Sequence, residues 1–175
     1  MRKLLLSLSE NERFRSWIEN FPLTKKLSAR FVAGEHLSDA LREIESLNSS
    51  GIMATLDHLG ENTHTPVEAQ QAASVYINIL DQIGSKKIDS NVSLKLTQMG
   101  LDIDEELCYQ NIKRVVERAE ELGNFVRIDM ESSEYTDRTL AIYKRLRDAG
   151  MDHVGVVIQA YLYRSKAGLE DLRDL

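Results

Sequence analysis

The sequence predicts an α/β protein of the (β/α)8 barrel type, with only about the first four to five βα units present. Short apolar runs alternate with longer amphipathic segments from residue 51 onward, a pattern typical of parallel strands joined by helices. No Gly-x-Gly-x-x-Gly follows the first run, which disfavours an open dinucleotide-binding sheet. A barrel usually takes about 250 residues, and this chain has 175. We therefore expect an incomplete barrel preceded by N-terminal helices.

The composition excludes several classes of protein. The chain is 42% hydrophobic and 29% charged, which suits a globular domain with a sizeable core. No run approaches the roughly 20 apolar residues that span a bilayer, and the apolar start is too short for a secretory signal. The formal net charge of −6, without a basic stripe, argues against nucleic acid as a partner. The single cysteine cannot form an internal disulfide, so we expect a cytoplasmic location.

Residues 1–50 are expected to form a helical arm and the helix that precedes the barrel. Within 1–34, Ser9 and Glu12 have the spacing of a capping box, and apolar residues then recur at helical intervals. The apolar stripe over 37–47 predicts the second helix. Residues 51–175 are then the first part of the barrel.

Strands and helices alternate through this second part. The strands are expected at 52–56, 92–96, 125–130 and 154–158. The helices are expected at 65–83, 102–122, 134–149 and from 168 onward. Pro66 suits the first turn of the first of these helices. Asp102, with Glu105 three residues later, is expected to cap the second.

Polar residues stand where the predicted strands end, the place where barrels carry their functional groups. They are Asp57, Glu61, Lys95, Asp129, Glu131 and Gln159. Lys95 lies between two leucines, and a buried ammonium is costly unless it is paired. We expect either Asp129 or a ligand carboxylate to face it. A purely structural ion pair is the alternative, but four strands delivering polar groups to one edge favour a functional site.

The residues alone leave two chemistries open. A strand-end lysine beside a carboxylate suits a Schiff-base lyase or aldolase, in which desolvation makes the amine nucleophilic. The same pair suits an enzyme that anchors a substrate carboxylate on Lys95 while hydride passes to a bound cofactor. No metal is expected, because His58 and His64 on either side of Glu61 do not have the spacing of metal ligands.

Five segments occur in order and at barrel spacing. They are Arg30–Glu35, Leu56–Glu61, Val92–Leu101, Phe125–Glu131 and Val156–Arg164. Together they resemble the FAD-dependent proline dehydrogenases, in particular the small monofunctional bacterial form. The resemblance implies a distorted (β/α)8 barrel. It also implies oxidation of L-proline to Δ1-pyrroline-5-carboxylate, the first step of proline degradation to L-glutamate. It further implies FAD as the cofactor and a quinone as the electron acceptor. Reaction with a quinone would involve peripheral association of the protein with the membrane.

The resemblance also implies roles for single residues. Lys95 is similar to the family lysine that pairs with the proline carboxylate, and Asp129 to the catalytic aspartate beside it. Met130 and Gln159 match positions that contact FAD. Glu61 matches a loop glutamate that pairs with an arginine of the last helix and excludes water from the site, with Asp57 at the start of that loop.

The family pattern continues with segments that this chain lacks. They are an Arg-x-Val-Lys-Gly-Ala-Tyr strand, a Thr-His pair and a final helix with two adjacent arginines. We therefore expect the chain to correspond to the N-terminal portion of such an enzyme, and to self-associate when isolated. Two alternatives remain: a lyase that uses Lys95 as a Schiff base, and a non-catalytic half-barrel that associates with another chain.

Overall fold

The computed structural model describes residues 33–34, 36–60 and 63–173. Most of the predicted helical arm and Glu61 lie outside the described residues. The chain divides into two compact units, Met1–Glu43 and Ile44–Leu175, and the division falls within helix α4 (Leu37–Ser49). The predicted division into 1–50 and 51–175 remains a prediction.

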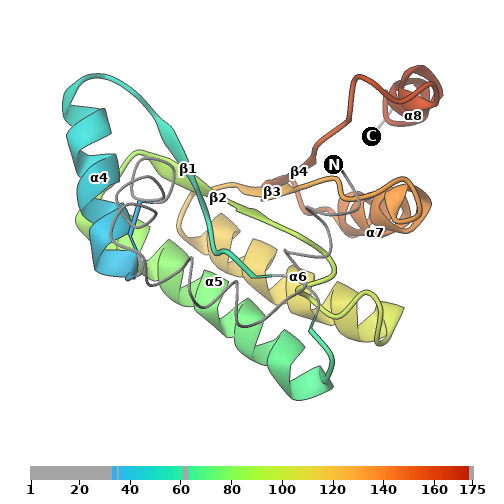
Figure 1. The fold of residues 1–175 in the computed structure, drawn as a ribbon, viewed down its shortest axis with the longest axis horizontal. Coiled ribbons are helices and arrows are strands. Elements are labelled where there is room, and N and C mark those ends of the chain that lie inside the picture. The colour runs from blue at the N-terminus through green and yellow to red at the C-terminus, as the bar shows by residue number, and fades with distance from the viewer. Residues whose placement is uncertain (1–32, 35, 61–62, 174–175) are drawn as a thin grey trace, which may run out of the picture. The chain divides into compact units, whose positions relative to one another are not determined.

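The second unit contains one parallel sheet of four strands (Figure 1). The strands are β1 (Ala54–Asp57), β2 (Ser90–Leu94), β3 (Val126–Ile128) and β4 (Val154–Val156). The helices that connect or follow them are α5 (Pro66–Lys86), α6 (Glu105–Glu121), α7 (Thr136–Asp148) and α8 (Ser165–Asp171). Each strand pairs in parallel with the next one along the chain.

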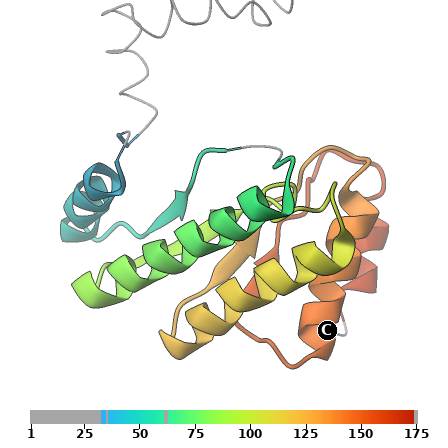
Figure 2. The ribbon, with the colours of Figure 1, turned by 90° about the horizontal axis from the view of Figure 1, so that it is seen from below.

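The order of the strands decides between the two α/β architectures. It is β1-β2-β3-β4, without a reversal. A doubly wound sheet reverses its order at a switch point, whereas a barrel repeats the same step around its circumference. Because parallel crossovers are right-handed, repeated steps in one direction carry the helices to the same face. Figures 1 and 2 show α5 and α6 side by side along one face of the sheet. The topology is therefore that of a barrel.

Helix α5 shows how the sequence produces this layer. Thr65 accepts a hydrogen bond from the Glu68 amide, and the Glu68 side chain accepts one from the Thr65 amide, so a capping box starts the helix. Its buried stripe consists of Ala69, Ala73, Tyr76, Ile79, Leu80 and Ile83. The helix ends where Lys87 adopts a left-handed conformation, with φ of 55°.

Three of the four strands end earlier than the apolar pattern suggested, whereas β1 ends one residue later, at Asp57. β2 covers Ser90–Leu94 instead of 92–96, and β3 and β4 each end two residues before the predicted position. Past β2 the chain turns, because the Leu96 carbonyl accepts hydrogen bonds from the amides of Met99 and Leu101. These three side chains are fully buried, so the apolar run reflects a buried turn and not a longer strand. Lys95 consequently follows β2 and is not within it.

Two helix starts also differ from the prediction. Asp104, not Asp102, caps α6, and its Oδ1 accepts a hydrogen bond from the Leu107 amide at 2.7 Å. Asp102 instead accepts one from the Tyr135 hydroxyl at 2.8 Å, which ties the turn after β2 to the start of α7. Helix α8 begins at Ser165, three residues earlier than expected. None of the helices in the described ranges has the length and apolar character to cross a bilayer.

Candidate functional site

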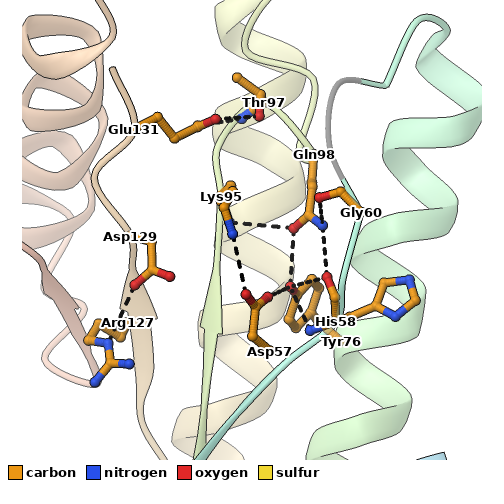
Figure 3. Close-up of polar contacts among 10 residues, drawn as sticks. All are labelled: Asp57, His58, Gly60, Tyr76, Lys95, Thr97, Gln98, Arg127, Asp129 and Glu131. Carbon is orange, nitrogen blue, oxygen red and sulfur yellow. Dashed lines mark hydrogen bonds and ion pairs between the residues drawn. The ribbon is translucent and has the colours of Figure 1, made fainter. Parts of the chain in front are cut away.

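Polar side chains from three neighbouring strands meet at the carboxyl edge of the sheet (Figure 3). Side chains alternate along a strand, and Leu56, Leu94 and Ile128 are buried. The next residues are Asp57, Lys95 and Asp129, which therefore lie on the opposite face from those leucine and isoleucine side chains. The predicted strand-end positions thus do share one edge.

The partner of Lys95 is Asp57. Lys95 Nζ lies 3.3 Å from Asp57 Oδ2, and the two side chains are 24% and 35% exposed. We expected Asp129 or a ligand carboxylate to face the lysine, and among the described residues the carboxylate beside it is that of Asp57 and not that of Asp129. Asp57 can take that place because it is the last residue of β1 and not part of the following loop.

The Tyr76 hydroxyl forms a hydrogen bond with Asp57 from the helix layer. It comes from α5, is fully buried, and lies 3.0 Å from Asp57 Oδ1 and 3.1 Å from Gln98 Oε1. Burial raises the pKa of the Tyr76 phenol well above its usual range, and the negative charge of Asp57 raises it further. The phenol is therefore a proton donor to Asp57. The sequence analysis missed Tyr76, although a lone tyrosine in an Ala- and Ile-rich buried stripe is a signal.

The Gln98 side chain joins the same cluster from the turn after β2. It is 3% exposed, and its Nε2 donates to the carbonyl oxygen of His58 at 2.9 Å and to that of Gly60. The chain segment that follows β1 is therefore bound directly to the turn that carries Lys95. Gln98 was also missed, and its only signal is a polar residue within the buried run after Lys95.

A carboxylate from the third strand end braces the other side of this turn. Glu131 accepts hydrogen bonds from the Thr97 amide at 3.2 Å and from the Thr97 hydroxyl at 2.7 Å. Glu131 therefore acts on the backbone of the turn and not on Lys95 itself.

Asp129 is less tightly held than Asp57. Its Oδ1 lies 3.5 Å from Arg127 Nε, within ion-pair distance, but the N–H of that nitrogen forms no hydrogen bond. Its side chain is 28% exposed. Its negative charge contributes to raising the pKa of Tyr76, so it acts electrostatically on the Asp57 cluster.

Met130 and Gln159 come together beyond β3 and β4. Both line a small hollow beneath α8, and Gln159 Nε2 donates to the Met130 carbonyl oxygen over a long 3.5 Å. Gln159 Oε1 is buried and has no hydrogen-bond partner among the described residues. A buried amide oxygen without a donor is unusual in a folded protein. It is an acceptor that the described residues leave without a donor.

The remaining observations limit the site. Glu61 lies outside the described residues, so its predicted role in closing the site stays a prediction. Across the described ranges, no three His, Cys, Asp or Glu side chains gather so that they could hold a metal ion. A larger hollow of about 630 Å³ lies at the opposite, amino edge of the sheet, between the ends of α5 and α6. Volume alone does not make it the site, because barrels carry their chemistry at the carboxyl edge.

The arrangement suits the binding of a small anion more than nucleophilic catalysis. An ammonium has three N–H donors, and Asp57 is the one side chain that Lys95 Nζ contacts among the described residues. Donors therefore remain for the carboxylate of a ligand. A Schiff-base lysine must instead leave its amine free to attack a carbonyl group, whereas Lys95 Nζ lies 3.3 Å from the Asp57 carboxylate.

Comparisons with known proteins agree on one family. The family described as proline dehydrogenase matches residues 40–175. Proline dehydrogenase 1 of Bacillus subtilis subsp. natto is 35% identical over 175 residues, which is 100% of this chain and 57% of that protein. Proline dehydrogenase of Deinococcus radiodurans is 35% identical over 98% of this chain and 57% of its own length. The chain thus spans a little over half the length of these curated relatives.

A solved structure supports the fold. The crystal structure of proline utilization A from Bdellovibrio bacteriovorus, inactivated by N-propargylglycine, superposes with a TM-score of 0.73. The match covers 82% of this chain and 18% of that protein, at 22% sequence identity. At this identity the likeness concerns the fold alone, and it agrees with the barrel-type order of strands.

Proposed function

Because the chain belongs to the proline dehydrogenase family, we propose that it forms part of an enzyme that oxidises L-proline to Δ1-pyrroline-5-carboxylate. The observation that carries the proposal is the Lys95 ammonium at the carboxyl edge, held by Asp57 and with N–H donors left for a ligand. Proline has a carboxylate that such an ammonium would bind through a charge-assisted hydrogen bond.

In this proposal the reaction converts the C–N single bond of proline into a C=N bond. The nitrogen loses a proton, and the ring carbon beside it loses a hydride, which FAD accepts when it is bound. Lys95 binds and orients the substrate carboxylate. Asp129, on the neighbouring strand end, supplies a negative charge that acts on the Asp57 cluster and on the reacting ring of the substrate.

Met130 and Gln159 are the residues of this chain that would hold the flavin. Gln159 fits that role because its Oε1 is a buried acceptor that lacks a donor among the described residues, and a flavin ring carries N–H groups that could supply one. Met130 lines the same hollow and offers an apolar, polarisable surface to a flat ring.

The physiological setting is part of the proposal. We propose a quinone as the electron acceptor, a cytoplasmic location, and closure of the loop after Asp57 by Glu61 over bound substrate. These points rest on the family membership of the chain alone.

The open ends of the sheet support self-association of the isolated chain. In the described part of the chain, β1 pairs with β2 alone and β4 pairs with β3 alone. β4 is Val-Gly-Val and has neither charge nor proline to block the addition of a further strand. We therefore expect sedimentation of the 175-residue chain to show oligomers, and a monodisperse monomer would contradict this.

The function is tested with two proteins. One is the 175-residue chain, and the other is a chimera in which the segment of the B. subtilis relative beyond the match continues the chain. We expect the isolated chain to be colourless and inactive, and the chimera to be yellow and to reduce a quinone in the presence of proline. A folded, yellow chimera that does not oxidise proline would refute the proposed function.

Lys95→Ala in the chimera should raise KM for proline and leave the flavin content unchanged. Loss of a charge-assisted hydrogen bond should cost about 1.5–3 kcal/mol, or more than about tenfold in kcat/KM. The measurement is steady-state kinetics together with flavin absorbance. An unchanged kcat/KM would remove Lys95 from the substrate site.

Asp129→Ala in the chimera should lower kcat, because the charge beside the lysine is lost. Asp129→Asn serves as the matched control for fold, since it keeps the shape and some hydrogen bonding. The two variants are compared in turnover and in thermal unfolding. Equal losses of thermal stability with full activity would make Asp129 a structural residue only.

A further inference from the structure

The Gln98 amide is a buried group with a polar neighbour in reach of each of its two polar atoms. Its two N–H donors face the carbonyl oxygens of His58 and Gly60, and its oxygen faces the Tyr76 hydroxyl at 3.1 Å and the Lys95 amide at 3.5 Å (Figure 3). A glutamine side chain has two donors and one oxygen with two acceptor sites. A buried amide with polar neighbours at both its nitrogen and its oxygen holds those neighbours in one arrangement.

All of these neighbours support the Asp57–Lys95 pair. The His58 and Gly60 carbonyls belong to the segment that leaves Asp57. The Tyr76 hydroxyl lies within hydrogen-bond distance of both Gln98 Oε1 and Asp57 Oδ1, and it can donate its single proton to one of them at a time. The Lys95 amide is the backbone of the lysine itself. Gln98 therefore contacts groups that hold Asp57 and Lys95 in place, although it contacts neither the carboxylate nor the ammonium itself.

We propose that Gln98 is a positioning residue that fixes Lys95 against Asp57 and so orients the ammonium toward the substrate carboxylate. This proposal rests on the proposed function for the identity of the ligand. Without the amide, the turn after β2 loses its direct link to the end of β1. The Lys95 ammonium would then separate from the Asp57 carboxylate more often, and its amine would be more exposed to solvent.

The accessibility of the Lys95 amine tests this directly in the 175-residue chain. The chain is treated under native conditions with an N-hydroxysuccinimide ester of acetic acid, and acylation of each lysine is followed by peptide mass spectrometry. Lys113, which pairs with Glu117 on the exposed side of α6, is the internal reference. In Gln98→Met, acylation of Lys95 relative to Lys113 should rise about fivefold, the factor that corresponds to one lost hydrogen bond.

The matched control is Asn111→Leu. Asn111 is also a buried amide, and its Nδ2 donates to the Met99 carbonyl oxygen in the same turn at 3.0 Å, away from Asp57. It should lower the stability of the turn without changing the ratio of Lys95 to Lys113 acylation. An equal rise in both variants would show a general loosening of the turn and would overturn the proposal.

Tyr76→Phe provides a second variant should Gln98→Met fail to fold. It keeps the buried ring and removes only the hydroxyl that joins Gln98 to Asp57, so Lys95 acylation should rise in it as well. An unchanged ratio in both variants would reject the role of Gln98. The labelling needs neither flavin nor proline, so its outcome is independent of whether the chimera oxidises proline.

Discussion

The two halves of the carboxyl edge differ in how completely their polar groups are bonded. At the ends of β1 and β2, the Tyr76 hydroxyl lies within hydrogen-bond distance of Asp57 and Gln98, and Asp57 pairs with Lys95. At the ends of β3 and β4, Gln159 Oε1 has no partner within the described residues, and the Arg127–Asp129 contact is a loose 3.5 Å. In the first half, residues of the chain itself hold the charged groups in place. In the second half, polar groups are left for a ligand to bind.

This difference separates the two proposed tasks. A substrate carboxylate needs a cation in a defined place, and a cation held by a buried network is already in that place before binding. A cofactor brings its own donors and acceptors, so the residues that hold it are expected to have free hydrogen-bonding positions. The half of the edge at β1 and β2 (the dense half) therefore matches substrate binding. The half at β3 and β4 (the sparse half) matches cofactor binding.

Tyr76→Ala should produce the largest loss of stability, because it removes a central member of the hydrogen-bond network in the dense half. Removing a fully buried ring should lower the free energy of unfolding by about 3–5 kcal/mol. Tyr161→Ala is the control beyond β4, where the ring is 79% exposed, and it should change stability by less than about 0.5 kcal/mol. Urea unfolding followed by circular dichroism measures both. Similar losses in the two variants would mean that Tyr76 does not anchor the network.

An alkaline titration should sharpen the comparison. The folded pKa of Tyr76 is raised, so above about pH 10 the unfolded chain loses a proton that the folded chain keeps. The unfolded state then binds fewer protons, and stability falls by up to about 1.4 kcal/mol per pH unit as the pH rises. The measurement is urea unfolding between about pH 8 and about pH 11. Tyr76→Phe should lack this part of the slope, and identical slopes would contradict the shift.

Substitution of the glutamine in each half should have unequal effects on stability, and the smallest change is expected in the sparse half. Gln98→Met removes a fully bonded amide and should cost about 1–3 kcal/mol. Gln159→Met removes an amide whose oxygen is already without a partner, so it should change the free energy of unfolding by less than about 0.5 kcal/mol or stabilise the chain. Urea midpoints of the two variants decide the matter. Equal costs would show that Gln159 is as well bonded as Gln98.

Local sequence patterns were sufficient for the elements and for the edge that carries the site. The alternation of apolar runs and amphipathic segments led to parallel strands joined by helices, as the structure has them. They were less reliable at boundaries. A buried turn and a strand both require apolar residues, so the run over 92–96 did not reveal that the chain turns after Leu94. Asp102 and Asp104 both have the chemistry of a cap, and the fold chose the second.

The partners within the site could not be read from the chain. Spacing along the sequence brings Asp57, Lys95 and Asp129 to strand ends, because strands and helices have regular periods. Which carboxylate pairs with the lysine depends on register and side-chain direction across strands that lie far apart in sequence. Tyr76 and Gln98 entered the site for the same reason: burial placed their polar atoms beside Asp57, and a buried polar atom must find a partner.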